Sequence, residues 1–166
     1  MVRQLTLIAG ACACVLALGC AKKAATQVAE VPTTGANIRG NLNVSDELLR
    51  RCNVTFGNAD RAPKFDFDDS ELLPQDRDVL EQIARCVTTG PLKGRKLALV
   101  GRADPRGEVE YNMVLGERRA DSVRDYLTRL GVSSGALSQT SRGELDAEGT
   151  DETSWKRDRR VDIALD

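Results

Sequence analysis

Residues 101–127, GRADPRGEVEYNMVLGERRADSVRDYL, join the end of a buried strand, a loop and a long helix. The apolar run KLALVG at 96–101 leads into this stretch, and a short run that is apolar on both faces is typical of a central strand. From about Val109 to Leu130 the pattern predicts a helix, with Gly131 as a natural C-cap residue. The stretch therefore predicts a strand–loop–helix unit at the centre of the fold.

One arginine of this helix falls on its apolar side. At about 100° per residue, Arg119 lies inside the stripe that Leu115 and Tyr126 form. A guanidinium in such a place keeps its proton and needs an anion. Two anions fit: an internal carboxylate, with Asp104 in the preceding loop as the candidate, or a ligand carboxylate. A zwitterionic ligand would place its ammonium against Asp104 and its carboxylate against Arg119.

The remaining predicted elements surround this unit. From Pro74 to about Thr88 the apolar residues recur at helical spacing, which predicts an amphipathic helix that Gly90-Pro91 ends. Further elements are predicted as follows: a short helix that Ser45 would cap, and strands at 52–56 (CNVTF), 63–68 (PKFDFD, with Phe65 and Phe67 on one face), 137–141 and 160–166. This order predicts an α+β fold, a two-layer sandwich with helices packed on a mixed sheet.

The first residues have the pattern of an export signal. Arg3 precedes an uncharged apolar run from Leu5 to Leu18, which is too short for an ordinary membrane span. LALGC, ending at Cys20, resembles a bacterial lipobox, whose cysteine carries lipid and becomes the mature N-terminus. We therefore expect a signal peptide at 1–19, then a lipidated N-terminus and flexible tether at 20–44. The alternatives are ordinary secretion with a free Cys20 thiol and a segment packed loosely on the domain.

The cysteines and the absence of histidine from the sequence limit the chemistry. Removal of the signal and lipidation would leave Cys52 and Cys86 as an even pair in an oxidising compartment, which predicts a disulfide. Two buried free thiols are the alternative. Because the 166-residue sequence contains no histidine, both thiol catalysis and a zinc site are disfavoured.

Charge and motifs disfavour several other classes of function. The net charge of -1 gives no basic field for nucleic acid. DFDDSE at 66–71 lacks the glycine and the distal glutamate of an EF-hand loop, so no metal site is predicted. The sequence positions no nucleophile–base pair, and we predict neither an enzyme nor a bound cofactor.

The stretch 101–127 resembles the OmpA-like peptidoglycan-binding domain, most closely that of the peptidoglycan-associated lipoproteins. The positions that match the family pattern are Asp104, Gly107, Tyr111-Asn112, Leu115 and Arg119-Ala120. FDFD at 65–68 resembles the first-strand motif of the family, and RDRRV at 157–161 resembles its closing motif. The resemblance covers residues from about 54 to 166, and we expect the domain to span 45–166.

The resemblance implies that Asp104 and Arg119 hold meso-diaminopimelate of the peptidoglycan stem peptide. The further residues that it places at this pocket are Asp68, Asn112, Leu115 and Arg159. It also implies an outer-membrane lipoprotein that faces the periplasm, anchored through lipid on Cys20, with peptidoglycan and Tol-system proteins such as TolB as partners. Arg102 and Asp158 depart from the family pattern, where histidine and asparagine are usual. The alternative function is an envelope scaffold, its pocket closed by an Asp104–Arg119 ion pair.

Overall fold

Helices pack against one mixed β-sheet in the computed structural model of the chain, which describes residues 37–39, 42–56 and 65–166. In chain order the elements are β1 (Asn37–Arg39), β2 (Leu42–Val44), α1 (Asp46–Cys52), α2 (Pro74–Thr88), β3 (Leu97–Arg102), α3 (Val109–Arg129), the 3-10 turn Ser134–Ala136, β4 (Leu137–Gly143), α4 (Glu152–Asp158) and β5 (Val161–Leu165). The predicted α+β class and the two-layer sandwich are confirmed.

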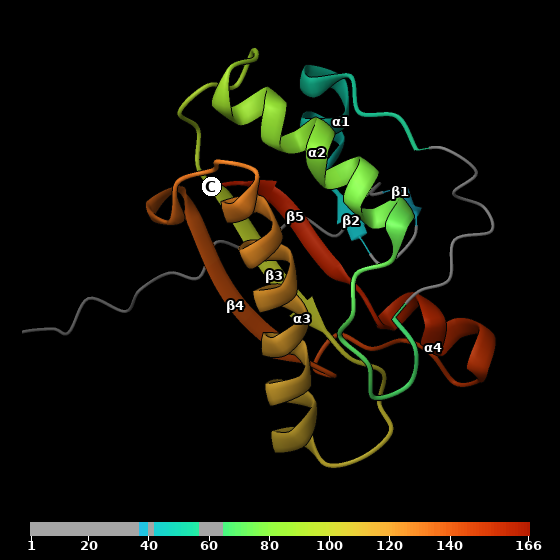
Figure 1. Cartoon of the computed structure of the whole chain (residues 1–166). Coiled ribbons are helices and arrows are strands. Elements are labelled where there is room, and N and C mark those ends of the chain that lie inside the picture. The colour runs from blue at the N-terminus through green and yellow to red at the C-terminus, as the bar shows by residue number, and fades with distance from the viewer. Residues whose placement is uncertain (1–36, 40–41, 57–64) are drawn as a thin grey trace, which may run out of the picture.

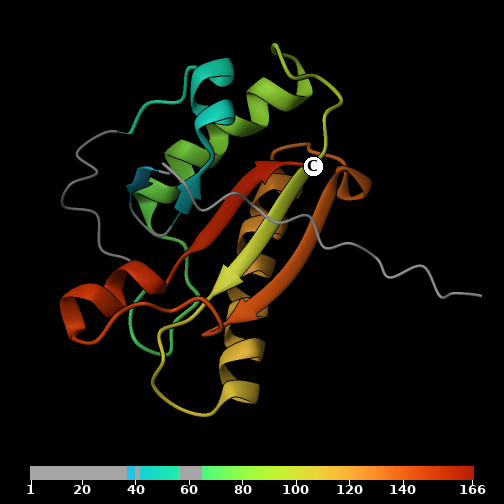
Figure 2. The same ribbon diagram turned by 180° about the vertical axis from the view of Figure 1, so that it is seen from behind.

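The sheet has the order β1-β2-β5-β3-β4. β3 pairs parallel with β4 and antiparallel with β5, while β2 pairs parallel with β5 and antiparallel with β1. Comparison of Figures 1 and 2 shows α2 and α3 on one face of this sheet, with α4 beyond the end at which β3 stops and β5 begins. The carboxyl end of β3 is therefore surrounded by α3, α4 and the loop that precedes α2.

The core lies between the sheet and the helices. Strand residues facing it include Leu97, Leu99, Val161 and Ile163, and helix residues include Leu80, Ile83, Ala120, Val123 and Leu127. These apolar side chains are almost fully buried, and removal of their surface from water is the main favourable contribution to folding. The apolar residues whose helical spacing predicted α2 and α3 are thus the residues that each helix buries against the sheet.

A backbone contact fixes α3 against β3. A Cβ atom on Gly101 would lie 1.7 Å from the carbonyl oxygen of Gly116, and one on Gly116 would lie 2.3 Å from Ser141 Oγ. The Gly101 contact is with backbone, so this position requires glycine, whereas a side chain at Gly116 would displace the Ser141 hydroxyl and press on the Gly101 carbonyl, 3.0 Å away. Because Arg119 follows Gly116 by less than one helical turn, this contact also places Arg119 beside the end of β3.

Two predicted strands are wrong. Residues 53–56 are irregular, since Cys52 ends α1, and residues 65–71 form a loop. Phe65 is 1% exposed and Phe67 is 61% exposed, so the two rings do not share a face. The backbone of this loop bonds to arginines from distant elements rather than to a neighbouring strand. Residues 63–64 of the second predicted strand lie outside the described residues.

The predicted start of the domain is also too late. β1 and β2 belong to the sheet, and Leu42 and Val44 are buried in the core. The folded domain therefore begins no later than Asn37, and residues 37–44 are not part of a flexible tether. The predicted signal peptide and Cys20 lie outside the described residues. Within the described part of the chain, no helix has both the length and the apolar character needed to cross a membrane.

The disulfide between Cys52 and Cys86 is present. It links the last residue of α1 to α2 across a sequence separation of 34 residues, with the two Cα atoms 5.4 Å apart. It closes the part of the domain that lies away from the carboxyl end of β3, so it acts on stability rather than on that end of the sheet.

Helix α4 was not predicted from the sequence. Asp151 caps it, because its carboxylate accepts a hydrogen bond of 2.8 Å from the backbone N–H of Ser154, and the Ser154 hydroxyl reaches back to the Asp151 backbone N–H. The Trp155 indole N–H donates to the Gly149 carbonyl at 3.0 Å, which folds the preceding loop onto the helix. This short helix faces the site described next.

Candidate functional site

A small pocket lies at the carboxyl end of β3, and all six predicted ligand-site residues line it. The lining residues are Phe67, Asp68, Asp104, Arg106, Tyr111, Asn112, Leu115, Arg119 and Arg159. Its volume is about 10 Å³, roughly the space of a single water molecule. The fold thus brings the predicted residues together, and the ligand-binding role of each stays a prediction.

Arg119 lies at the base of this site with 0% of its surface exposed. Its guanidinium donates three hydrogen bonds, all to backbone carbonyls: Nε to Asp69 at 2.8 Å, Nη1 to Arg102 at 2.8 Å and Nη2 to Asp66 at 3.2 Å. The guanidinium carbon also lies 5.1 Å from the centre of the Phe65 ring. Arg119 therefore connects α3 to the end of β3 and to the loop before α2.

No carboxylate of the described residues lies within ion-pair distance of Arg119, so the predicted alternative, an Asp104–Arg119 ion pair, is not formed. Burial and, to a smaller extent, the positive charge of Arg159 together lower the pKa of Arg119 to about 10. Arg119 is still charged at neutral pH. A buried cation held only by neutral carbonyls is electrostatically suited to receive an anion.

Asp104 is paired with two other arginines. One of its oxygens, Oδ2, accepts from Arg159 Nη1 at 2.9 Å and from Arg106 Nη2 at 2.8 Å. Burial alone would raise the pKa of this carboxyl, but hydrogen bonds from Arg106 and Arg159 outweigh burial and hold the pKa below its usual value. Asp104 is therefore ionised at neutral pH and holds two cations.

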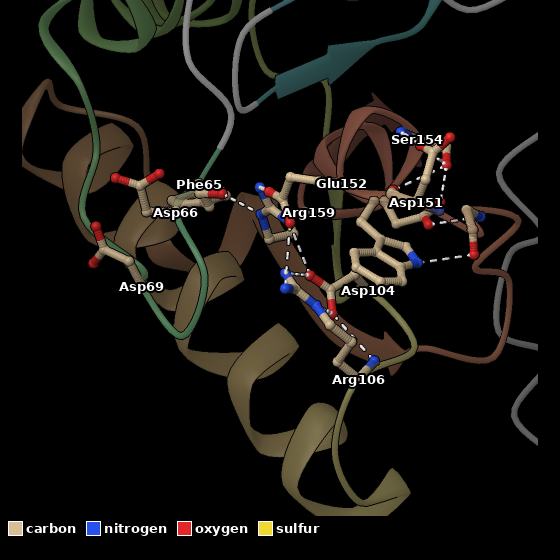
Figure 3. A network of polar contacts seen from close by, with 12 residues as sticks. Phe65, Asp66, Asp69, Asp104, Arg106, Asp151, Glu152, Ser154 and Arg159 are labelled. Carbon is tan, nitrogen blue, oxygen red and sulfur yellow. Dashed lines mark hydrogen bonds and ion pairs between the residues drawn. The ribbon is translucent and has the colours of Figure 1, made fainter.

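Glu152 of α4 completes a ring of four charges with Asp104 and its two arginines, and we call this set the pocket ring (Figure 3). Glu152 Oε1 lies 2.9 Å from Arg159 Nη2, and Oε2 lies 3.2 Å from Arg106 Nη1. Arg159 is anchored further by a hydrogen bond of 2.6 Å from its Nε to the Phe65 carbonyl. Each acid of the ring thus contacts both bases.

Of the two arginines in the pocket ring, Arg106 is the one whose side chain is partly exposed to solvent. Its side chain is 31% exposed, against 2% for Arg159. Its guanidinium lies between two aromatic rings, 4.3 Å from the centre of Phe67 and 4.4 Å from that of Trp155. Contacts of this kind attract a cation to the face of each ring.

Two further contacts shape the pocket wall. Asn112 Nδ2 donates to the Arg106 carbonyl at 3.0 Å and also to the Glu144 carboxylate, so Asn112 holds the loop that carries Arg106. The Tyr111 hydroxyl donates to Asp68, and this hydrogen bond raises the pKa of Tyr111. Asp68 has a φ of 59°, a conformation uncommon for residues other than glycine. Asn112 and Asp68 therefore contribute to the pocket through specific polar contacts.

Sequence analysis missed Arg106, Glu152 and Trp155. The signal for Arg106 was present, since it follows Asp104 by two residues in the same loop. Glu152 and Trp155 follow the Asp151 cap, and a search for capping residues would have found their helix. Their contact with Arg106 joins segments far apart in the sequence, and local patterns do not report such a contact.

The two departures from the family pattern lie outside the pocket lining. Arg102 donates from Nε to Asp162 at 2.8 Å on the sheet. The Asp158 carboxylate accepts from the backbone N–H groups of Gly149 at 2.9 Å and Glu148 at 3.3 Å, which fixes the loop before α4. Each departure thus has a local structural role. Among the described residues, no group of histidine, cysteine, aspartate and glutamate has the arrangement of a metal site.

Comparison with known proteins identifies the family to which the chain belongs. Residues 64–161 match the model of the OmpA family. This match covers more than half of the chain and includes every residue of the pocket. The chain therefore belongs to the OmpA family.

Individual relatives within this class are lipoproteins by name. The chain is 35% identical over 162 residues to the peptidoglycan-associated lipoprotein of Pseudomonas putida, and the alignment covers 92% of each chain. It is 38% identical over 123 residues to that of Pseudomonas aeruginosa, covering 73% of this chain and 67% of the relative. The crystal structure of the peptidoglycan-associated lipoprotein from Burkholderia pseudomallei superimposes with a TM-score of 0.58 at 36% identity, covering 63% of this chain and 88% of that one.

Proposed function

We propose that this domain binds peptidoglycan non-covalently by holding the free end of meso-diaminopimelate in the pocket, and that it tethers the outer membrane to the cell wall. The observation that carries the proposal is Arg119, a fully buried guanidinium for which the described residues supply carbonyls but no paired carboxylate. Three arginines and two aspartates line the pocket, so its lining carries one more positive charge than negative. A ligand carboxylate would balance that charge.

The free end of diaminopimelate carries both charges that the site can use. A guanidinium has five N–H donors, and the three hydrogen bonds of Arg119 leave two for a ligand carboxylate. The ligand ammonium would then bind Asp104, which is ionised and lies in the same pocket. Leu115 and Asn112 would contact the carbon chain between these charges, and Asp68 and Arg159 would hold the walls.

The remaining parts of the proposal concern attachment. The lipobox-like sequence ending at Cys20 supports a signal peptide at 1–19 and a lipid anchor in the outer membrane, with the domain in the periplasm. The names of the relatives support association with peptidoglycan. A single weak pocket suffices for such a tether, because membrane attachment and dense wall sites raise the effective concentration. The role requires no bond to be made or broken, so we propose a binding protein and not an enzyme, with Tol-system proteins such as TolB as further predicted partners.

A competition experiment tests the proposal with the unmodified protein. The mature chain is bound to purified sacculi, and free meso-diaminopimelate or 1,5-diaminopentane is added at equal concentration. We expect diaminopimelate to release the protein and 1,5-diaminopentane to release much less, because this diamine carries ammonium groups but no carboxylate for Arg119. Absence of sacculus binding would favour the envelope scaffold instead. Binding that diaminopimelate does not reduce would place the wall contact outside this pocket.

A further inference from the structure

We propose that Arg106 is a built-in competitor for the ligand ammonium, and that it thereby determines which ligands the pocket admits. This inference rests on the proposed function. In the structure the Arg106 guanidinium occupies the position beside Asp104 that a ligand cation would need, with Nη2 2.8 Å and Nε 3.2 Å from the two carboxylate oxygens. The pocket therefore contains its own substitute for one half of the ligand.

The volume of the site supports this interpretation. Only about 10 Å³ of the pocket is open while Arg106 lines it, and an amino acid side chain with a charged end group cannot enter so small a space. Something must move for a ligand to bind. Of the two cations on Asp104, Arg159 is 2% exposed and is tied to the Phe65 carbonyl, whereas Arg106 is 31% exposed. Arg106 is the cation that can leave.

Contacts away from Asp104 provide an alternative position for the Arg106 side chain. Its guanidinium already lies between Phe67 and Trp155, and Glu152 is within 3.2 Å of Nη1. Glu152 is half exposed and belongs to α4 rather than to the pocket lining. A shift toward Glu152 and away from Asp104 would keep the charge of Arg106 paired. The backbone of Arg106 would stay in place, because Asn112 holds its carbonyl.

Because of this arrangement, the pocket opens at low cost only for a ligand that carries an ammonium. A ligand that carries an ammonium replaces the charge of Arg106 on Asp104. A ligand that lacks one leaves the buried Asp104 carboxylate with Arg159 as its one cationic partner among the described residues if the Arg106 side chain moves away, which is unfavourable. The apparent affinity of any ammonium ligand is reduced by the fraction of molecules in which Arg106 remains on Asp104.

The test compares two synthetic tripeptides, L-alanyl-γ-D-glutamyl-meso-diaminopimelate and the same peptide ending in 2-aminopimelate, which lacks the free ammonium. Binding to the mature chain is measured by calorimetry for wild type, Arg106→Met, Arg106→Lys and Arg118→Met. Methionine keeps an unbranched chain between the two aromatic rings but carries no charge, and lysine keeps a charge that can reach Asp104. Arg118 is an exposed neighbour of Arg119 that does not line the pocket, so its variant is the matched control.

We expect Arg106→Met to bind the diaminopimelate peptide roughly three- to tenfold more tightly than wild type, since the partly exposed Arg106 guanidinium no longer competes with the ligand ammonium for Asp104. The aminopimelate peptide should gain at least as much, because its binding to wild type also requires Arg106 to leave Asp104, so the preference for the diaminopimelate peptide should not increase. Arg106→Lys and Arg118→Met should stay near wild type. Thermal melting of each variant reports whether it is folded. Weaker or unchanged binding of the diaminopimelate peptide by folded Arg106→Met would overturn the inference. Weaker binding would indicate that Arg106 contacts the ligand directly. If neither wild type nor Arg106→Met binds either peptide, the proposed function itself is wrong.

Discussion

Two groups of buried charges lie close together in this domain and differ in how completely they are paired. On the sheet, Asp162 accepts from Asn43, Arg102 and Arg160, each at 2.8 Å, and we call these four residues the Asp162 cluster. All four side chains are buried. At the pocket, the ring of Asp104, Arg106, Glu152 and Arg159 has two members that are partly exposed to solvent, and Arg119 beside it has no paired carboxylate among the described residues.

The difference separates structural charges from charges available to a ligand. In the Asp162 cluster each buried arginine contacts a carboxylate of the same cluster, so a ligand would gain nothing by entering. At the pocket, Arg106 is partly exposed, and Arg119 has no paired carboxylate among the described residues. Sequence alone does not distinguish the two groups, because each combines arginines with acidic residues that lie far apart in the chain.

The largest effect should come from breaking the Asp162 cluster. Asp162→Ala leaves Arg102 and Arg160 buried without this carboxylate, and loss of one partner from a buried ion pair costs about 3–5 kcal/mol. Urea unfolding of the mature domain measures the change. The folded fraction should still bind sacculi. A loss of stability below about 1 kcal/mol would show that the cluster is not a structural element in the sense used here.

Opening the disulfide supplies a stability reference remote from both groups of charges. Replacement of Cys52 and Cys86 by serine releases a loop with a sequence separation of 34 residues, and chain entropy predicts a loss of about 3–4 kcal/mol. Thermal melting with and without reductant gives the value for wild type, and thiol counting confirms the bond. Sacculus binding below the melting temperature should not change. If it falls, the pocket and the distant end of the domain are coupled.

Arg119→Lys should have its main effect on binding. Lysine keeps the charge but loses the planar fork, so sacculus affinity should fall by about 1.5–3 kcal/mol, roughly tenfold or more. Some stability should also be lost, because the three carbonyls that Arg119 serves would lose donors. Binding and melting are therefore measured on the same samples. A folded Arg119→Lys protein that binds as well as wild type would contradict the proposed role.

The smallest effect concerns pH and tests the pocket ring. The folded pKa of Asp104 is lowered, so its contribution to stability is complete above the unfolded pKa of about 3.9 and is lost as pH falls through the folded value. Between pH 6 and pH 2, wild type should therefore lose more stability than Asp104→Asn. Chemical denaturation at a series of pH values gives both curves. Parallel curves would mean that the ring does not stabilise the ionised carboxylate.

Periodic elements were predictable, whereas elements held by distant side chains were not. α2, α3 and β3 follow from apolar spacing and from Pro74 and Gly131, because each buries one regular face or lies wholly inside. The alternation at 65–68 has the pattern of a strand. It forms a loop instead, since Arg119 and Arg159 take up its backbone carbonyls. Nothing within the loop itself reports those partners.

The site was predictable as a set of residues but not as a set of pairs. Asp104, Asn112, Leu115 and Arg119 lie in one strand–loop–helix unit, so their proximity follows from local geometry. The pairing of Asp104 with Arg159, in place of Arg119, depends on where α4 and β5 lie, whereas Arg106 pairs with Asp104 within one loop. Two residues fifteen positions apart can line the same pocket without sharing a bond.

The position of β1 has a mechanical consequence under the proposed tethering role. In the sheet register, Arg39, Leu42, Val161 and Gly101 lie in one row at the pocket end, whereas Asn37, Val44, Ile163 and Leu99 lie in a row farther from it. β1 thus begins in the row farther from the proposed peptidoglycan-binding pocket and runs toward the pocket. A pull on the residues before Asn37, directed away from the pocket, acts along the strands.

Inter-strand hydrogen bonds run across the strand direction, so such a pull shears the bonds between β1 and β2 together instead of peeling them apart one by one. The same sheet would then transmit tension from membrane to wall in the direction in which it resists separation best.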